Sequence, residues 1–270
     1  LLSFGLLTLT ATYADAYCGK LVTLSTHDET QTKYSLAGLT DKSLMIVVLL
    51  PGGPGFMDLD DNVCPQRLKG NSLVKSQTYF HNNEIATALV DAPSDYQDRD
   101  GLGGFRIHSD HAADIGKVIT DVRRRTNLPV WLIGTSRGSI SAANAASRLS
   151  GPAAPDGLVL TSPVTSGYVG GYKEWVEQTV FSTSLDAIKI PTLVIAHAED
   201  KCVRTPPELA SNITQKISSA RKKLIMITGG PDWDGGTSRK ACRGKSPHGF
   251  LGKRKHVVLK IIDFMHAKNE

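Results

Sequence analysis

The chain has 270 residues, of which 40% are hydrophobic and 21% are charged. This composition can supply a large apolar core, and it excludes a disordered chain, a collagen-like repeat and a fibrous protein. The formal net charge of +5 is spread along the chain rather than gathered in one arm, so we expect no nucleic-acid partner. One large globular domain is the default for an α/β chain of this length.

The first residues resemble a targeting segment. Leu1 to Thr12 are apolar or small and too few to span a bilayer, and the pattern Ala14-Asp15-Ala16 that follows suits signal peptidase. We interpret residues 1–16 as the remnant of a signal peptide and residues 17–270 as the catalytic domain. The alternative is a native first strand. The first interpretation predicts a secreted or periplasmic protein, and Tyr17 before Cys18 argues against a lipid anchor.

Short apolar runs alternate with helical patterns through the rest of the chain. Two strands at residues 20–25 and 32–37 have no helix between them and should form an antiparallel edge. Further strands are expected at residues 43–50, 85–90, 130–133, 157–160, 192–196 and 223–227. Helices are expected at residues 111–124, 139–149, 206–219 and 256–267. The alternation predicts an α/β fold with a mostly parallel sheet of about eight strands and helices on both faces.

One long connection with aromatic residues, residues 165–187, interrupts this alternation. It is too short for a separate domain, so we expect it to overhang a site and to form a minimal cap at most.

The sequence Gly134-Thr135-Ser136-Arg137-Gly138 lies between a buried strand and a helix rich in alanine and serine. In this context Gly-x-Ser-x-Gly is typical of a nucleophile elbow, a tight turn that projects the serine hydroxyl at the carboxyl edge of a sheet. The pentapeptide also occurs in ordinary loops, so the flanking strand and helix carry the interpretation. Ser136 is the predicted nucleophile.

A serine hydroxyl needs a base to take its proton, and in this fold class the base follows the acid in the chain. His256 and His266 lie within or beside the last predicted helix, where a solvent-facing histidine is ordinary. His248 lies in the loop just before that helix and is the predicted base, whereas His197, at a strand end, is a competitor that could line the pocket.

Asp200 directly follows the strand at residues 192–196, where its carboxylate can orient the imidazole of His248. Asp232 and Asp234 follow the next strand and are the alternatives. Their Gly-Pro-rich surroundings are equally typical of a turn.

An oxyanion hole requires two backbone N–H groups, one from the residue after the nucleophile, here Arg137. The second should come from the loop Pro51-Gly52-Gly53-Pro54-Gly55. Because Pro54 has no N–H, the donor is Gly53 or Gly55. The loop lacks the Gly-Lys-Ser/Thr ending of a phosphate-binding loop, and no metal or cofactor is implied.

Four cysteines form an even set whose spacings match no CxxC metal pattern, so disulfides are favoured in an exported protein. Cys202 and Cys242 lie close in sequence to the proposed acid and base, and a bridge between them would clamp those two loops. Cys64 follows the oxyanion loop, which leaves Cys18 as its partner. Four unpaired buried thiols are the alternative.

The order of these motifs resembles that of the α/β-hydrolase superfamily, from about residue 20 to the C-terminus, and in particular its exported bacterial members. A difference is that Pro51 opens the oxyanion loop where the family usually has a histidine. The resemblance implies a serine hydrolase that acts through an acyl-enzyme. We expect its substrate to be a small or polymeric carboxylic ester, because esters are commoner and easier substrates than amides.

Two alternatives stay open. One is a peptidase or amidase of the same fold, because Gly-Gly-Pro-Gly loops also occur in proline-specific members. The other is a non-catalytic ligand-binding descendant of the fold. The sequence does not determine the acyl-chain length or the oligomeric state.

Overall fold

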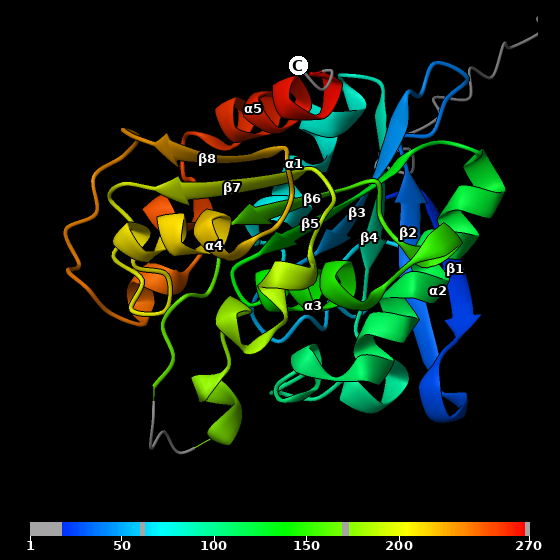
Figure 1. Cartoon of the computed structure of the whole chain (residues 1–270), viewed down its shortest axis with the longest axis horizontal. Helices are drawn as coiled ribbons and strands as arrows, with labels where there is room; N and C mark the ends of the chain where they lie inside the picture. Colours follow the sequence, from blue (N-terminus) through cyan, green and yellow to red (C-terminus); the bar gives the residue numbers. More distant parts are fainter. Residues whose placement is uncertain (1–17, 60–62, 169–172, 268–270) are drawn as a thin grey trace, which may run out of the picture.

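The computed structural model describes residues 18–59, 63–168 and 173–267. The predicted signal-peptide remnant at residues 1–16 lies outside the described residues. Within them, eight strands form one sheet in the order β1-β2-β4-β3-β5-β6-β7-β8 (Figure 1). Their bounds are β1 Lys20–Ser25, β2 Gln31–Ala37, β3 Met45–Leu50, β4 Ile85–Val90, β5 Val130–Thr135, β6 Gly157–Thr161, β7 Thr192–His197 and β8 Lys222–Ile227.

The sheet is parallel from β4 to β8. The strands β1 and β2 pair antiparallel at one edge, and β2 pairs antiparallel with β4. This arrangement confirms the predicted fold class, including its antiparallel edge. Since parallel strands end at one edge of the sheet, the loops after β3, β5, β6, β7 and β8 meet there.

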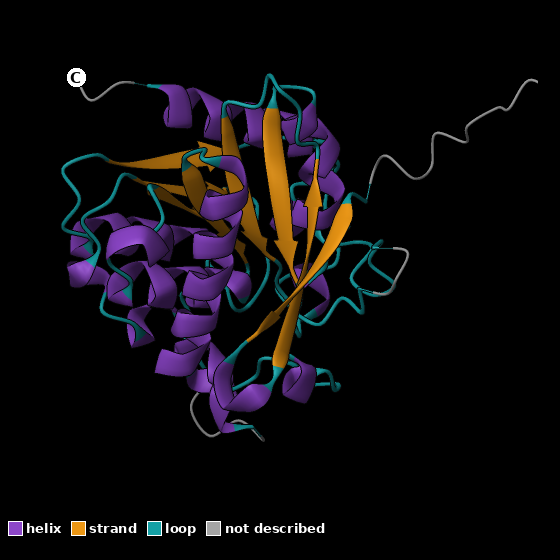
Figure 2. Ribbon diagram, turned by 90° about the vertical axis from the view of Figure 1, so that its right-hand side faces the viewer, coloured by secondary structure: helices purple, strands orange, loops and turns teal. Residues whose placement is uncertain are grey.

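Helices cover both faces of the sheet (Figure 2). One face carries α1 (Ser72–His81) and α5 (Arg254–His266), and the other carries α2 (Ser109–Thr126), α3 (Gly138–Arg148) and α4 (Ala210–Lys216). The sequence does not predict α1, whose polar residues give it little amphipathic pattern. Its first turn is capped by Asn71, whose side chain accepts a hydrogen bond from the Leu73 N–H at 3.0 Å.

The strands differ in burial according to their position. Every residue of β3 to β7 is buried, as expected for central strands covered on both faces. In the terminal strand β8 three of the six residues are exposed, and two of these are the lysines at its start, Lys222 and Lys223. The apolar run in the sequence thus predicts a strand here, but it does not predict that this strand lies at the edge of the sheet.

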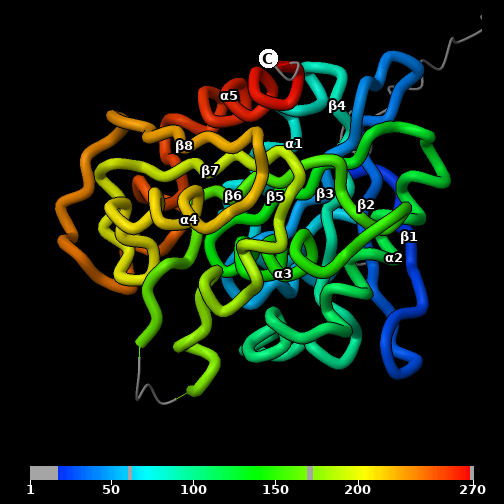
Figure 3. Tube along the Cα trace, in the orientation of Figure 1, coloured from blue at the N-terminus to red at the C-terminus, as the bar shows by residue number. Residues whose placement is uncertain are grey.

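The connection between β6 and β7 extends away from the sheet as the green-to-yellow segment (Figure 3). Its described residues contain three single-turn 3₁₀ helices, at Glu174–Glu177, Val180–Ser182 and Leu185–Ala187, and no longer helix. Val164, Val180 and Ile188 anchor the segment in the core. Among the described helices, none is long and apolar enough to cross a membrane.

Candidate active site

Ser136 lies in the tight turn between β5 and α3 with a φ of 51°, in the left-handed region that non-glycine residues rarely adopt. The two flanking glycines allow this turn because a Cβ at Gly134 would collide with the Gly138 carbonyl, and one at Gly138 with the Leu50 carbonyl of β3. The hydroxyl is held at the carboxyl edge of the sheet, which is the geometry of the predicted elbow.

His248 lies in the 3₁₀ turn Pro247–Gly249 that precedes α5, and it is only 5% exposed. Its Nδ1 lies 2.9 Å from Oδ2 of Asp200, which follows β7 and is equally buried. The backbone carbonyl of His248 accepts a hydrogen bond from the Ser162 hydroxyl at 2.8 Å, which holds the turn against the end of β6. His248 and Ser136 line the same cavity of about 50 Å³. The fold thus brings the three predicted side chains to one edge of the sheet.

Thr205 also contacts Asp200 and His248, although nothing in the sequence around it predicts these contacts. Its hydroxyl donates to Oδ2 of Asp200 at 2.7 Å and lies 3.0 Å from Nδ1 of His248. The other carboxylate oxygen of Asp200 accepts the Cys202 N–H at 2.8 Å. Both oxygens are therefore hydrogen-bonded, and the carboxylate is fixed toward the imidazole.

Two disulfides are present, and both have the predicted partners. Cys202 is bonded to Cys242, with their Cα atoms 4.5 Å apart, and this bridge joins the loop of Asp200 to the loop that leads to His248. Cys18 is bonded to Cys64, with their Cα atoms 5.0 Å apart, and ties the entry to β1 to the chain beyond the oxyanion loop.

The loop after β3 distinguishes the two glycines predicted as oxyanion donors. The Gly55 N–H donates to the Gly52 carbonyl at 3.3 Å and is therefore occupied. Gly53 lines the small cavity with Ser136, and within the described residues the N–H groups of Gly53 and Arg137 have no acceptor. Gly53 and Arg137 are thus the pair with free N–H groups.

Arg106 is a second residue that the sequence does not reveal. Its side chain is buried, and its guanidinium donates to the Gly53 carbonyl at 3.2 Å and to the Ser141 hydroxyl at 2.7 Å. A Cβ at Gly55 would lie 2.8 Å from this guanidinium, so the glycine there makes room for Arg106. Burial, with repulsion from Arg137, holds the pKa of Arg106 well below its ordinary value. Arg106 therefore fixes the backbone of the oxyanion loop through its hydrogen bond to the Gly53 carbonyl.

The remaining candidates lie elsewhere. Nε2 of His197 donates to the Gly229 carbonyl at 3.0 Å, and its Nδ1 lies 2.8 Å from Oε2 of Glu199. With Asp232 it lines a separate cavity of about 310 Å³. Asp232 and Asp234 are both exposed, so the acidic partner of His248 in the structure is Asp200.

Asp200, Cys202 and His248 also bring potential metal-ligating atoms within 4.8 Å of one another. The sulfur of Cys202 is in a disulfide, and the side chains of Asp200 and His248 bond each other. This donor set does not suit a metal ion, because a ligating sulfur must be a thiolate.

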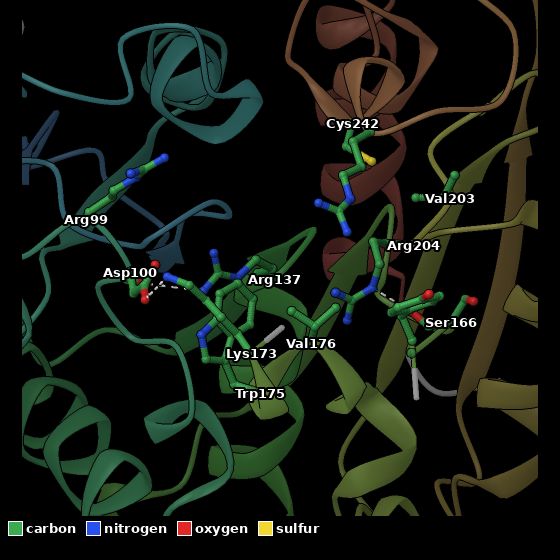
Figure 4. Close-up of a pocket in the computed structure, with 13 residues that line it drawn as sticks. Arg99, Asp100, Arg137, Ser166, Lys173, Trp175, Val176, Val203, Arg204 and Cys242 are labelled. Carbon is green, nitrogen blue, oxygen red and sulfur yellow. Dashed lines mark hydrogen bonds and ion pairs between the residues drawn. The ribbon is translucent and has the colours of Figure 1, made fainter. Parts of the chain in front are cut away.

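A much larger cavity, of about 1120 Å³, adjoins the elbow (Figure 4). It is lined by the residue after the nucleophile, Arg137, and by Cys242, which also lines the small cavity. The loops after β4, β5, β6, β7 and β8 all contribute to its walls. Trp175 and Val176, from the connection after β6, form part of it, so this connection overhangs the site as expected.

No protein-family model matches the chain, and no curated protein matches its sequence. Solved structures match its fold. Dienelactone hydrolase from Anabaena variabilis superposes with a TM-score of 0.59 at 15% identity, over 94% of this chain and 100% of that one. Est1E from Butyrivibrio proteoclasticus, bound to ferulic acid, gives 0.59 at 14% identity, over 90% and 99%. A serine hydrolase without lid from Xanthomonas campestris gives 0.55 at 13% identity, over 90% and 94%.

These likenesses show that the chain has the α/β-hydrolase fold, as the resemblance of its motifs implies. At such low identity they define the fold alone.

A buried histidine near the oxyanion loop, His111, should make the stability of the protein depend on pH. Nε2 of His111 lies 2.8 Å from the Ser141 hydroxyl, which also accepts from Arg106. Burial and the neighbouring charge of Arg106 lower the pKa of His111 to about 3. In the unfolded chain an ordinary histidine has a pKa of about 6.5.

Below about pH 6.5 the unfolded chain therefore binds a proton at residue 111 that the folded protein does not bind. The free energy of unfolding should therefore decrease as the pH is lowered, by up to about 1.4 kcal/mol per pH unit between pH 6.5 and pH 3. His111→Gln should lose this part of the slope. Denaturant titrations at pH 7, 6 and 5 measure both proteins, and parallel pH dependences would contradict the prediction.

Proposed function

We propose that this α/β-hydrolase-fold protein is a serine hydrolase that cleaves carboxylic esters through an acyl-enzyme. One observation carries the proposal: Ser136, at positive φ in a strand-to-helix turn, shares a cavity with His248, whose Nδ1 is hydrogen-bonded to buried Asp200. A nucleophile, a base and a group that orients the base are the three roles that acyl transfer by serine requires.

The roles follow from the contacts. Asp200 accepts the Nδ1–H of His248 and so keeps the imidazole in the tautomer whose Nε2 is free to act as a base. Nε2 takes the hydroxyl proton as Oγ of Ser136 bonds the ester carbon. The negative charge that develops on the carbonyl oxygen is met by the N–H groups of Gly53 and Arg137.

The tetrahedral intermediate then expels the alcohol, which takes the proton from Nε2 of His248 and leaves Ser136 acylated. Water attacks the acyl carbon as His248 accepts one of its protons. Collapse of the second intermediate returns that proton to Oγ of Ser136 and releases the carboxylic acid. Each half-reaction uses the same base and the same two N–H groups.

Two considerations favour esters over amides as the substrate. Esters are the easier acyl donors, because an alkoxide leaves more readily than an amide nitrogen. Proteins of the same fold include a dienelactone hydrolase and an esterase from Pyrococcus furiosus, the latter with a TM-score of 0.58 and 14% identity.

The proposal extends to the compartment. Two disulfides, one of which joins the loops of the acid and the base, form and persist in oxidising surroundings such as the periplasm or the exterior of the cell. We therefore propose that the protein functions there, which agrees with the interpretation of residues 1–16 as a targeting remnant.

Ser136→Ala removes the nucleophile and should abolish turnover of 4-nitrophenyl esters, with kcat lower by at least about 10⁴-fold. A fluorophosphonate probe should label the wild-type protein and not this variant. Ser150→Ala, at an exposed serine just beyond the end of α3, is the matched control and should still be labelled. Absence of labelling in the folded wild-type protein would overturn the proposal.

Asp200→Asn keeps the shape of the side chain but removes the acceptor that selects the tautomer of His248. We expect kcat to fall by about four orders of magnitude. Asp232→Asn, in the exposed loop after β8, makes the same change in chemistry and should leave kcat within twofold. The opposite pattern would transfer the role of the acid to Asp232.

Thr205→Val removes the hydroxyl that donates to Asp200 while it preserves the branched shape. A lost hydrogen bond to a charged group predicts a decrease in kcat of about tenfold or more, with little change in KM. Thr205→Ser restores the hydroxyl and should recover most of the activity. If valine and serine had equal effects, Thr205 would serve packing rather than positioning.

A further inference from the structure

The large cavity beside the elbow is strongly cationic. Its charged side chains are Arg99, Asp100, Arg137, Lys173, Arg204 and Arg239, which are five cations and one anion. Lys173 pairs with the carboxylate of Asp100. Within the described residues, none of the four arginines forms an ion pair with a carboxylate of the protein. Among the described residues, the positive charge of these four arginines therefore has no carboxylate paired with it.

Two of these arginines are held in fixed orientations. The guanidinium of Arg137 stacks over the ring of Trp175 at 4.0 Å and donates to the Asp100 carbonyl at 3.3 Å. Arg204 donates to the carbonyls of Ser166 at 2.6 Å and Gln178 at 2.9 Å. Figure 4 shows Arg99 and Arg137 on one side of the cavity and Arg204 on the other. The charges are thus preorganised, which lowers the entropic cost of binding an anion.

The arrangement costs folding energy. Burial and repulsion from Arg204 lower the pKa of Arg137 to about 10, and burial and repulsion from Arg239 lower the pKa of Arg204. Both groups stay charged at neutral pH. Like charges held close together without a counterion are stabilised when an anion binds between them.

The position of the cavity relates it to the chemistry. Arg137 is the neighbour of Ser136 in the chain, and Cys242 lines both this cavity and the small one that holds Ser136 and His248. A molecule in the large cavity can therefore extend to the nucleophile. Val176 and Val203 add apolar wall between the arginines, which suits a ligand with an apolar body and an anionic end.

We propose that the substrate is an ester that carries a carboxylate group, and that the arginines of this cavity bind that carboxylate while Ser136 attacks the ester carbon. The proposal rests on the hydrolase function proposed above and names its substrate class. Guanidinium groups bind a carboxylate through two parallel hydrogen bonds, which gives both affinity and orientation. Arg137 then has two roles: its N–H faces the oxyanion, and its side chain faces the distal carboxylate.

Two pairs of esters test this. The first is the 4-nitrophenyl ester of suberic acid, with the distal carboxylate either free or methylated. The second is the butyrate ester of 4-hydroxybenzoate against that of methyl 4-hydroxybenzoate. The pairs place the charge on the acyl side and on the alcohol side of the scissile bond. In at least one pair, kcat/KM of the wild-type protein should be about tenfold or more higher for the anionic member.

Arg239→Glu and Arg99→Glu each reverse an exposed charge of the cavity wall, from different loops. Each should lower kcat/KM for the preferred anionic ester by about tenfold or more, while the neutral member changes by less than about threefold. Lys189→Glu makes the same change in charge on an exposed lysine that precedes β7, at the opposite edge of the sheet. It should alter neither rate.

Turnover of all four esters without a preference for charge in the wild-type protein would overturn the substrate class and leave the hydrolase function intact. Equal losses on both members of a pair in the two arginine variants would also overturn it. If none of the esters were cleaved and Ser136 were not labelled by fluorophosphonate, the proposed function itself would fail, and the substrate class with it.

Discussion

The site depends on the close contact of three backbone segments at Gly138: the end of β5, the start of α3 and the end of β3. The first turn of α3 lies directly against the end of β3, and the space that a Cβ would need is taken by the Leu50 carbonyl. Leu50 is the last residue of β3, and the oxyanion loop begins with the next residue. The same contact therefore sets the position of Ser136 and the position of the Gly53 N–H relative to each other. In the proposed mechanism, N–H donors held in this way stabilise the developing charge because they need no rearrangement during the reaction.

Local patterns in the sequence determine much of this fold. The five central strands consist mostly of apolar residues, and all five were predictable because burial on both faces favours an apolar run over an alternating pattern. The helix α1 was not, because its stability comes from packing against α5 and from its cap rather than from a marked apolar stripe. The order of Ser136, Asp200 and His248 was predictable from motifs at strand ends. Thr205 and Arg106 were not, because each acts through a contact with a residue 43 or 53 positions away.

The net charge of +5 gives no indication of the cationic cavity. Arg99, Arg137, Arg204 and Arg239 stand in four different loops, and along the chain they look like isolated surface charges. The four arginines come together in the fold because the loops that follow parallel strands all lie at the same edge of the sheet. A charge analysis by sequence window detects runs of charge, whereas this cluster exists only in three dimensions. Its cost in stability is typical of sites where function and folding make opposite demands.

The exposed edge of the sheet has a separate consequence. Within the part of the chain that the structure describes, β8 pairs with a strand on one side only, so the backbone N–H and C=O groups of its other side can pair with a strand of another molecule. Lys222 and Lys223 stand exposed at its start. A copy of the same strand that paired in parallel and in register would bring its two lysines next to Lys222 and Lys223, at a cost that rises as water is excluded. The lysines of β8 thus oppose parallel edge-to-edge pairing, a role for charge that is unrelated to the binding of substrate.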